Sequence, residues 1–195
     1  MNEKLGLYGG AFDPPHRGHV ELARAAKDAL GLDRLLVLVA DAPGHKRVET
    51  PGAARLALAR AAFPDDEVVL DEHARTIDLL RAHPDWAGAT LVIGADQFAD
   101  FLSWKEPDEV LRHVRVAVAT RPGYPQARLD AVLDELQAPD RVEFFDLEPI
   151  PLASSELRDR LARGDDVGDD VPPAAAAIIR REGLYEDAHG YTGID

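Results

Sequence analysis

Residues 6–19 read Gly-Leu-Tyr-Gly-Gly-Ala-Phe-Asp-Pro-Pro-His-Arg-Gly-His, and this stretch decides the fold. It begins inside an apolar run, residues 5–8, that is typical of a short buried strand. Gly9 and Gly10 follow where bulky side chains would keep a ligand away from the backbone. From about Gly18, apolar residues recur at helical spacing. The stretch therefore predicts a strand, a glycine turn and a helix whose N-terminal N–H groups and dipole attract an anion such as phosphate.

Two histidines, His16 and His19, stand three residues apart where this helix begins. At that spacing both imidazoles project from one side, and two neighbouring donors suit a polyphosphate. A metal pair is one alternative, although no further Cys or His lies nearby and the Glu of the usual zincin motif is missing. A pair of helix-capping histidines without a ligand is another. It would explain one histidine, but not the glycines, the Asp-Pro-Pro turn and the second histidine together.

Five further apolar runs alternate with helix-like segments along the chain. Thr50-Pro51 is typical of a helix start, with a capping hydroxyl before a proline at the first helical position, and Pro107 indicates another start. Near-continuous Val, Leu and Ile in the central runs indicate strands buried on both faces, as in a parallel sheet covered by helices. We therefore expect an α/β fold, Rossmann-like and doubly wound, with a mainly parallel sheet in a single domain over residues 1–186 and a flexible tail over 187–195. The runs are 35–40, 67–70, 89–93, 114–119 and 142–145.

Composition narrows the function classes. The chain has 195 residues, 46% of them hydrophobic, which is enough for one well-filled domain and excludes a disordered chain. No apolar run approaches a membrane span and the N-terminus does not resemble a signal peptide, so we expect a cytoplasmic protein without membrane partners. The absence of cysteine removes disulfides and thiolate nucleophiles. A net charge of −14 argues against nucleic acid as a partner, although a local basic pocket is allowed. The number of subunits stays open.

Acidic pairs at 165–166 and 169–170 stand beside Gly164 and Gly168, a pattern typical of a solvated loop rather than of a metal site. We assign no metal-ligating residues anywhere in the chain. Because the chain has no cysteine, catalysis must depend on groups other than thiolates.

Residues 9–19 resemble the signature of the nucleotidylyltransferase superfamily, and their closest match is the bacterial nicotinate-nucleotide adenylyltransferase family. That family has the pattern Gly-Gly-x-Phe-Asp-Pro-x-His-x-Gly-His, whereas the similar pantetheine-phosphate adenylyltransferases usually have Thr at the position of His16. Collinear matches run from about Gly6 to Tyr185. The resemblance implies a Rossmann-like enzyme that transfers AMP from ATP to nicotinate mononucleotide, giving deamido-NAD and pyrophosphate in NAD biosynthesis. It also implies Mg²⁺ with the ATP. A different acceptor, such as nicotinamide mononucleotide, and a non-catalytic nucleotide-binding module are the alternatives.

Loops after the second and fourth predicted strands extend the resemblance. His45 and Lys46 lie in a turn-rich loop that could hold a phosphate or simply be a polar crossover. They match the end of a Pro-Pro-His-Lys-like segment of the family, and this resemblance implies that they bind the acceptor. Gly94 would let an adenosine approach, and Asp96 could accept hydrogen bonds from ribose hydroxyls or cap a helix. The resemblance favours the nucleotide role for both, and it assigns Trp104 to the nicotinate side.

The last motifs follow the fifth and sixth predicted strands. Arg121 stands in an Arg-Pro-Gly turn that matches a family segment and could meet a phosphate or the edge of the nucleotide. Ser154 or Ser155 could cap a helix with Arg158 one turn further on the same side, which suits the phosphate tail of ATP; an ordinary Ser-capped helix is the alternative. The segment is similar to the family's Ile-Ser-Ser-Thr-x-Ile-Arg, with Ala153 in place of the first Ser.

The sequence departs from the family pattern at residues 74–76, a segment expected to recognise the acceptor. Ala-Arg-Thr replaces the usual Ser-Tyr-Thr there, and only Thr76 matches. We expect the acceptor's phosphate oxygen to attack the α-phosphorus of ATP without an enzyme nucleophile. The predicted catalytic residues are His16, His19 and Arg158. They are expected to bind ATP together with Gly9, Gly10, Phe12, Gly94, Asp96, Arg121, Ser154 and Ser155, while His45, Lys46, Thr76 and Trp104 bind the acceptor.

Overall fold

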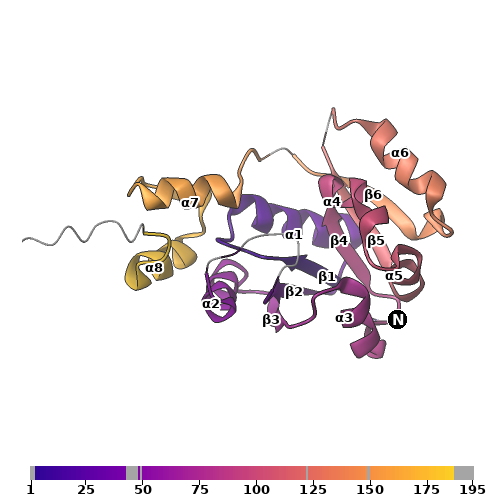
Figure 1. The fold of residues 1–195 in the computed structure, drawn as a ribbon, viewed down its shortest axis with the longest axis horizontal. Coiled ribbons are helices and arrows are strands. Elements are labelled where there is room, and N and C mark those ends of the chain that lie inside the picture. Colours follow the sequence, from indigo (N-terminus) through magenta and orange to yellow (C-terminus); the bar gives the residue numbers. More distant parts are fainter. Residues whose placement is uncertain (1–2, 43–47, 49, 122, 149, 187–195) are drawn as a thin grey trace, which may run out of the picture.

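Six parallel strands form one sheet in the order β3-β2-β1-β4-β5-β6 (Figure 1). The computed structural model describes residues 3–42, 48, 50–121, 123–148 and 150–186. The strand order reverses at β1, which pairs with β2 on one side and β4 on the other, and ligands of such sheets bind beside this reversal at the carboxyl ends. The predicted Rossmann-like fold is confirmed, and every predicted strand is present with its ends shifted by two residues at most. The strands are β1 (Leu5–Gly10), β2 (Arg34–Ala40), β3 (Glu67–Asp71), β4 (Thr90–Gly94), β5 (Arg115–Thr120) and β6 (Val142–Asp146).

Helices cover both faces of the sheet. Val37 and Val39 of β2 point toward α1 and α2, whereas Leu36 and Leu38 point toward the layer of α3, α4, α5 and α6. This alternation buries five consecutive residues of β2, which explains its continuous apolar sequence. The helices are α1 (Arg17–Leu30), α2 (Gly52–Ala62), α3 (Thr76–Ala82), α4 (Ala95–Ala99), α5 (Pro107–His113), α6 (Gln126–Glu135), α7 (Ser154–Ala162) and α8 (Pro173–Glu182).

The predicted helix starts agree with the structure except in one detail. Pro107 is the first residue of α5, as expected. Pro51, however, is the extended N-cap of α2 and not its first residue, and no side chain caps this helix. The prediction that the Thr50 hydroxyl caps α2 is therefore wrong, because Thr50 lies one residue too early. Thr50 is instead buried, and its carbonyl oxygen accepts a hydrogen bond from Arg55.

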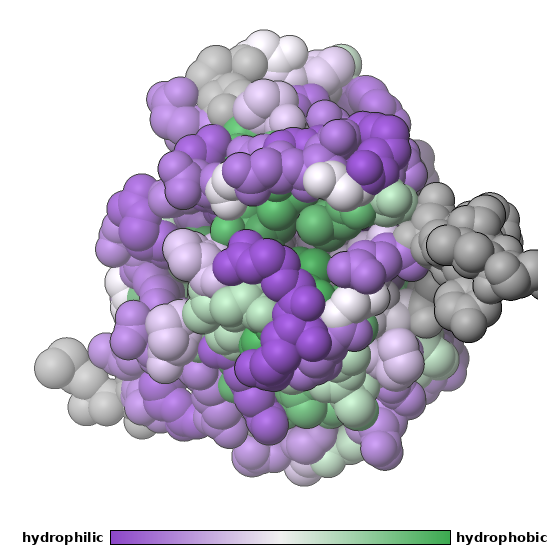
Figure 2. Space-filling view, turned by 90° about the vertical axis from the view of Figure 1, so that its left-hand side faces the viewer, coloured by the Kyte–Doolittle hydropathy of each residue, from purple (hydrophilic) through white to green (hydrophobic). Residues whose placement is uncertain are grey.

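A third hydrophobic cluster joins α7 and α8 to the outer side of α2. Leu58 of α2 packs with Leu157 of α7 and Ile179 of α8. Figure 2 shows the end of the molecule where α7 and α8 lie: hydrophilic residues dominate it, with a hydrophobic strip between them. Among the described helices, none is long and apolar enough to cross a membrane.

The acidic loop after α7 is mostly exposed to solvent, as the sequence suggested, and two of its acids also form ion pairs with arginines. Arg160 Nη1 lies 2.7 Å from Asp170 Oδ2, and Arg163 Nη2 lies 3.0 Å from Asp165 Oδ2. The prediction did not consider these two arginines, Arg160 in the last turn of α7 and Arg163 at its C-cap. These ion pairs fold part of the acidic loop back onto α7.

Candidate active site

The turn between β1 and α1 holds both motif histidines on a packed aromatic base. His16 is the N-cap of α1 and is 7% exposed, and its ring stacks on His19 with centroids 3.7 Å apart. Phe12 lies in the hydrophobic core, where its ring meets His19 edge-on at 5.2 Å and Phe63 at 5.6 Å. The backbone φ of Phe12 is +50°, a left-handed conformation that costs a non-glycine residue about 1–3 kcal/mol. The aromatic packing thus holds a strained turn that brings the two imidazoles together.

A backbone hydrogen bond fixes the tautomer of His19. The N–H of His16 donates to His19 Nδ1 at 3.1 Å. Because Nδ1 accepts this bond, the proton of the neutral ring lies on Nε2, which is therefore a donor. A donor at a helix N-terminus suits a phosphate oxygen. The helix-capping role considered for the histidines is thus real for His19, and it is compatible with anion binding.

Helix α7 reaches the same turn from the far end of the chain. Arg158 Nη1 donates to the carbonyl oxygen of Asp13 at 2.7 Å, and Ser154 Oγ donates to that of Pro14 at 3.0 Å. The N-cap of α7 is Ala153 and no side chain caps the helix, so the predicted capping by Ser154 or Ser155 is wrong. Ser154 is already the first residue of the helix, and its hydroxyl instead donates to the carbonyl oxygen of the distant Pro14. Three predicted site residues, His16, His19 and Arg158, therefore belong to one structural unit.

Asp13 is the point where the two ends of the chain meet. It is 2% exposed, and its Oδ1 accepts a hydrogen bond of 2.8 Å from the Tyr185 hydroxyl. Its Oδ2 is buried and has no hydrogen-bond partner within the described residues. Burial, together with the charge of Asp13, raises the pKa of Tyr185 well above its usual value, so the phenol stays a donor. Tyr185 was not predicted as a site residue, since the sequence alone does not show that it contacts Asp13.

A fully buried arginine ties together the strand ends that flank this turn. Arg55 of α2 is 0% exposed and makes no ion pair with any residue that the structure describes. Instead, its guanidinium donates to four backbone carbonyl oxygens at the carboxyl ends of β1 and β2 and at the start of α2. These are Ala11 at 2.9 Å, Ala40 at 2.6 Å, Asp41 at 2.7 Å and Thr50 at 3.0 Å.

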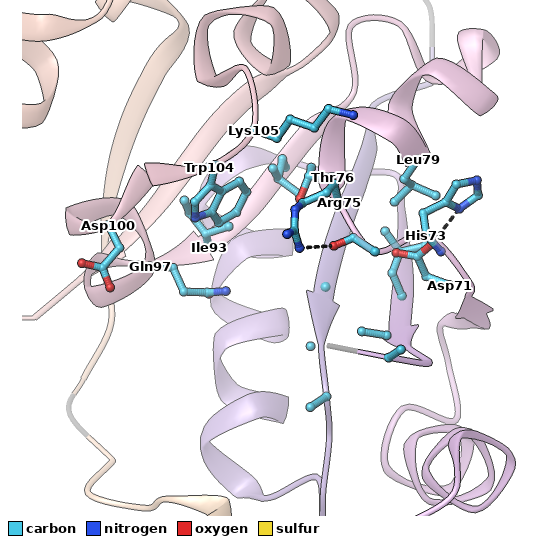
Figure 3. Close-up of a pocket in the computed structure, with 18 of the residues that line it drawn as sticks. Asp71, His73, Arg75, Thr76, Leu79, Ile93, Gln97, Asp100, Trp104 and Lys105 are labelled. Atoms are coloured by element: carbon cyan, nitrogen blue, oxygen red, sulfur yellow. Dashed lines mark hydrogen bonds and ion pairs between the residues drawn. The ribbon is translucent and has the colours of Figure 1, made fainter. Parts of the chain in front are cut away.

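A cavity of about 450 Å³ opens at the carboxyl ends of β1, β2 and β4 (Figure 3). Gly9 and Gly10 line it, and a Cβ at Gly9 would meet no atom within 4 Å. The predicted acceptor residues Thr76 and Trp104 line it as well, with apolar side chains of the sheet between them. His16, His19, Arg158 and the two serines are not among its lining residues. The cavity is therefore adjacent to the histidine turn along β1 rather than part of it.

The predicted nucleotide-side residues lie together at the next strand ends. Gly94 ends β4 and pairs in register with Ala119 of β5, which brings Arg121 to the same edge of the sheet. Asp96 is exposed, and its Oδ1 accepts a hydrogen bond of 3.2 Å from the Tyr124 hydroxyl. Burial and the charge of Asp96 raise the pKa of Tyr124. Tyr124 was not predicted, since its segment resembles an ordinary turn.

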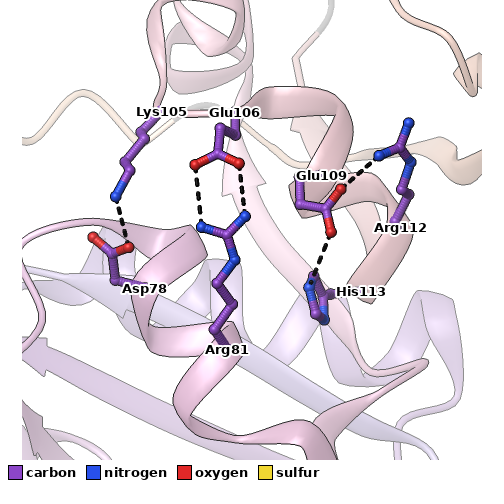
Figure 4. A network of polar contacts seen from close by, with 7 residues as sticks. All are labelled: Asp78, Arg81, Lys105, Glu106, Glu109, Arg112 and His113. Atoms are coloured by element: carbon purple, nitrogen blue, oxygen red, sulfur yellow. Dashed lines mark hydrogen bonds and ion pairs between the residues drawn. The ribbon is translucent and has the colours of Figure 1, made fainter.

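Ion pairs fasten the two segments that carry Thr76 and Trp104 (Figure 4). Lys105 Nζ lies 2.8 Å from Asp78 Oδ1, and Arg81 contacts both carboxylate oxygens of Glu106, at 3.1 and 2.6 Å. The hydrogen bond from Lys105 lowers the pKa of Asp78, and that from Arg81 lowers the pKa of Glu106. These pairs connect helix α3 to the segment before α5, and thus join the two walls of the cavity.

Two predicted acceptor residues, His45 and Lys46, lie outside the described residues. Within the described ranges, no group of three or more His, Asp or Glu side chains is arranged to hold a metal ion. The remaining predicted residues form three neighbouring groups at one edge of the sheet: the histidine turn with α7, the cavity, and the ends of β4 and β5.

Comparisons with known proteins agree with this geometry. Residues 7–160 match the model of the cytidylyltransferase-like family. A probable nicotinate-nucleotide adenylyltransferase of Bordetella avium is 36% identical over 95% of this chain and 100% of its own length. One of the same name from Chromobacterium violaceum is 35% identical over 95% and 100%. The structure of Plasmodium falciparum nicotinic acid mononucleotide adenylyltransferase complexed with NaAD superposes with a TM-score of 0.71, at 18% identity, over 94% of this chain and 98% of that one.

Proposed function

This chain belongs to the nicotinate-nucleotide adenylyltransferase family, and we propose that it transfers the adenylyl group of ATP to nicotinate mononucleotide, releasing deamido-NAD and pyrophosphate. The observation that carries the proposal is the meeting of two helix N-termini at one turn. His16 and His19 stand at the start of α1, and Arg158 of α7 is hydrogen-bonded to the Asp13 carbonyl of the same turn. The strand that leads into this turn also lines the cavity next to Trp104.

The proposed reaction is one in-line substitution. A phosphate oxygen of the acceptor forms a bond to the α-phosphorus of ATP as the bond from that phosphorus to the bridging oxygen breaks, and pyrophosphate leaves with the electron pair. His16, His19 and Arg158 donate hydrogen bonds to the phosphate oxygens and offset the charge that develops on them. Positioning and charge stabilisation account for catalysis of this kind, and no enzyme nucleophile takes part.

The other residues divide between the two substrates. Phe12 acts through His19, whose ring it supports. Thr76 and Trp104, on the cavity walls, bind the acceptor together with His45 and Lys46. The proposed ATP-binding residues are Gly9, Gly10, Phe12, Gly94, Asp96, Arg121, Ser154 and Ser155 in addition to His16, His19 and Arg158.

Magnesium is the proposed divalent ion. Mg²⁺ prefers oxygen ligands in octahedral geometry and often keeps several waters when it binds a nucleotide. The described residues around the histidine turn offer donors for phosphate and a single buried carboxylate, Asp13. These groups fit an ion held mainly by triphosphate oxygens and water, where it would offset negative charge on the leaving group.

Pyrophosphate release tests the proposal. We would measure it with ATP and magnesium, using nicotinate mononucleotide, nicotinamide mononucleotide and phosphopantetheine as acceptors, and confirm product masses. Loss of one transition-state donor typically costs about 3–4 kcal/mol, so His19→Ala should lower kcat a hundred- to a thousandfold. His113→Ala, on the outer helix α5, is the matched control and should keep normal turnover. Binding of ATP without turnover on any acceptor would refute the proposed activity.

A further inference from the structure

One cationic side chain that lines the cavity forms no ion pair with an acidic side chain within the described residues. Three basic side chains line its described part: the histidine His73 and the cationic Arg75 and Lys105. His73 Nδ1 lies 2.9 Å from an oxygen of Asp71, and Lys105 Nζ lies 2.8 Å from an oxygen of Asp78. Arg75, in contrast, makes a single hydrogen bond, to the carbonyl oxygen of the adjacent residue at 3.1 Å, and no ion pair within the described ranges. The cavity therefore presents an available guanidinium.

The direction of Arg75 follows from its place in the fold. It is the extended N-cap of α3, immediately before Thr76, and its side chain is among those lining the cavity. Figure 3 shows the guanidinium reaching into the space between the Trp104 ring and the pair of Asp71 and His73. Arg75 is exposed at the cavity, and in a chain with a net charge of −14 its guanidinium is a local centre of positive charge.

We propose that Arg75 is a specificity-determining residue: its guanidinium binds the carboxylate on the pyridine ring of the acceptor, and it thereby selects the acid over the amide. The inference rests on the proposed function. A planar guanidinium matches a carboxylate with two parallel hydrogen bonds, and a neutral carboxamide offers one acceptor oxygen and no charge. The flat face of Trp104 in the same cavity suits an aromatic ring.

The position of Arg75 also indicates that it binds the carboxylate rather than a phosphate of the substrates. The proposed phosphate-binding residues, His16, His19 and Arg158, do not line this cavity, whereas Arg75 and Trp104 do. An acceptor whose phosphate lies at the histidine turn would therefore present its opposite end, the pyridine ring, to Arg75. Recognition there changes the choice between acceptors without changing the binding of ATP.

Two substitutions and two acceptors test this inference. We would measure kcat/KM from initial rates of pyrophosphate release at saturating ATP, with nicotinate and nicotinamide mononucleotides, for the wild type, Arg75→Gln and Arg75→Lys. Hydrogen bonds to a charged group suggest a loss of about ten- to a hundredfold for the nicotinate form in Arg75→Gln. The nicotinamide form should change by less than about threefold, because it lacks the charge that Arg75 pairs with. Arg75→Lys should recover part of the preference.

The control is Arg24→Gln, an exposed arginine of α1 that contacts only acids of its own helix. It should leave both values unchanged. Equal losses for both acceptors in Arg75→Gln would overturn the inference, because the arginine would then act on a group common to both. Unchanged values would overturn it as well. If the wild type itself shows no turnover with nicotinate mononucleotide, the proposed function fails, and that outcome is distinct from failure of the inference.

Discussion

Replacing Arg55 with methionine should destabilise the protein by about 3–5 kcal/mol, a large effect for a residue that contacts no acid within the described residues. The guanidinium is completely buried and donates to four carbonyl oxygens at 2.6–3.0 Å. Methionine has a similar length and fills the space but offers no donor, so the carbonyl oxygens would lose this partner. A buried acceptor left unsatisfied costs about 1–3 kcal/mol.

Two effects reduce the cost below a simple total of four hydrogen bonds. Removing the guanidinium also removes the penalty for burying its charge, which is several kcal/mol. Some of the carbonyl oxygens can reach water once the strand ends loosen. Each carbonyl oxygen that stays unsatisfied costs about 1–3 kcal/mol, and these two effects offset part of that sum, so we expect Arg55→Met to cost about 3–5 kcal/mol in total.

Denaturation in urea would measure this loss. The midpoint concentration should fall at an unchanged slope, and Tm should drop by roughly 6–20 °C for a chain of this size. Arg60→Met is the control on the same helix, since Arg60 is exposed and has one long hydrogen bond of 3.4 Å. Its effect should stay within about 0.5 kcal/mol. A loss below about 1 kcal/mol for Arg55→Met would show that the four bonds do not stabilise the fold.

Four further substitutions probe the turn and its supports. Gly6→Ala places a Cβ 2.5 Å from a Leu side chain and should lower the free energy of unfolding by about 1–3 kcal/mol. Gly9→Ala places a Cβ where it meets no atom, so it should keep the stability of the protein while raising KM for the acceptor. Denaturation measures the first effect and steady-state kinetics the second. Gly18→Ala puts a Cβ 3.0 Å from His16 Nδ1, so kcat should fall while Tm does not, and a normal kcat would mean that His16 need not be held in place. Tyr185→Phe removes the donor to a buried carboxylate and should cost about 1–3 kcal/mol in urea denaturation; no change would show that water replaces the hydroxyl.

Local pattern explains most of what the sequence could predict. The six strands are short apolar runs separated by helix signals, and their burial on both faces makes them continuous in hydrophobicity. The glycines and histidines of residues 9–19 likewise lie at consecutive positions of one turn, so their proximity follows from the sequence alone. The position of each strand, to within two residues, and the fold class are therefore predictable without any knowledge of long-range contacts.

Contacts between distant segments could not be predicted. Arg55 stands on a helix whose pattern would place a charged residue in solvent, and its burial depends on carbonyl groups from two other segments. The pairing of Asp13 with Tyr185 spans 172 residues. In the sequence, Arg75 is only a departure from the family pattern. Its significance depends on which of the neighbouring basic side chains already have acidic partners. The capping errors at Thr50 and Ser154 come from where each helix begins: Thr50 lies one residue before the N-cap of α2, whereas Ser154 is already the first residue of α7 and its hydroxyl bonds the Pro14 carbonyl.

The bonds from Arg158 and Tyr185 to Asp13 have a consequence for how this protein is made. A ribosome produces the histidine turn long before its two distant partners, which lie 145 and 172 positions further along the chain. At about 5–20 residues per second, the 172 residues between Asp13 and Tyr185 require roughly 10–35 seconds. During that time the nascent chain can pair its early strands, yet the buried carboxylate of Asp13 has no phenol to meet it. The turn therefore reaches its final form only in a chain translated as far as its last helix, and products of interrupted translation keep the motif but lack the finished site.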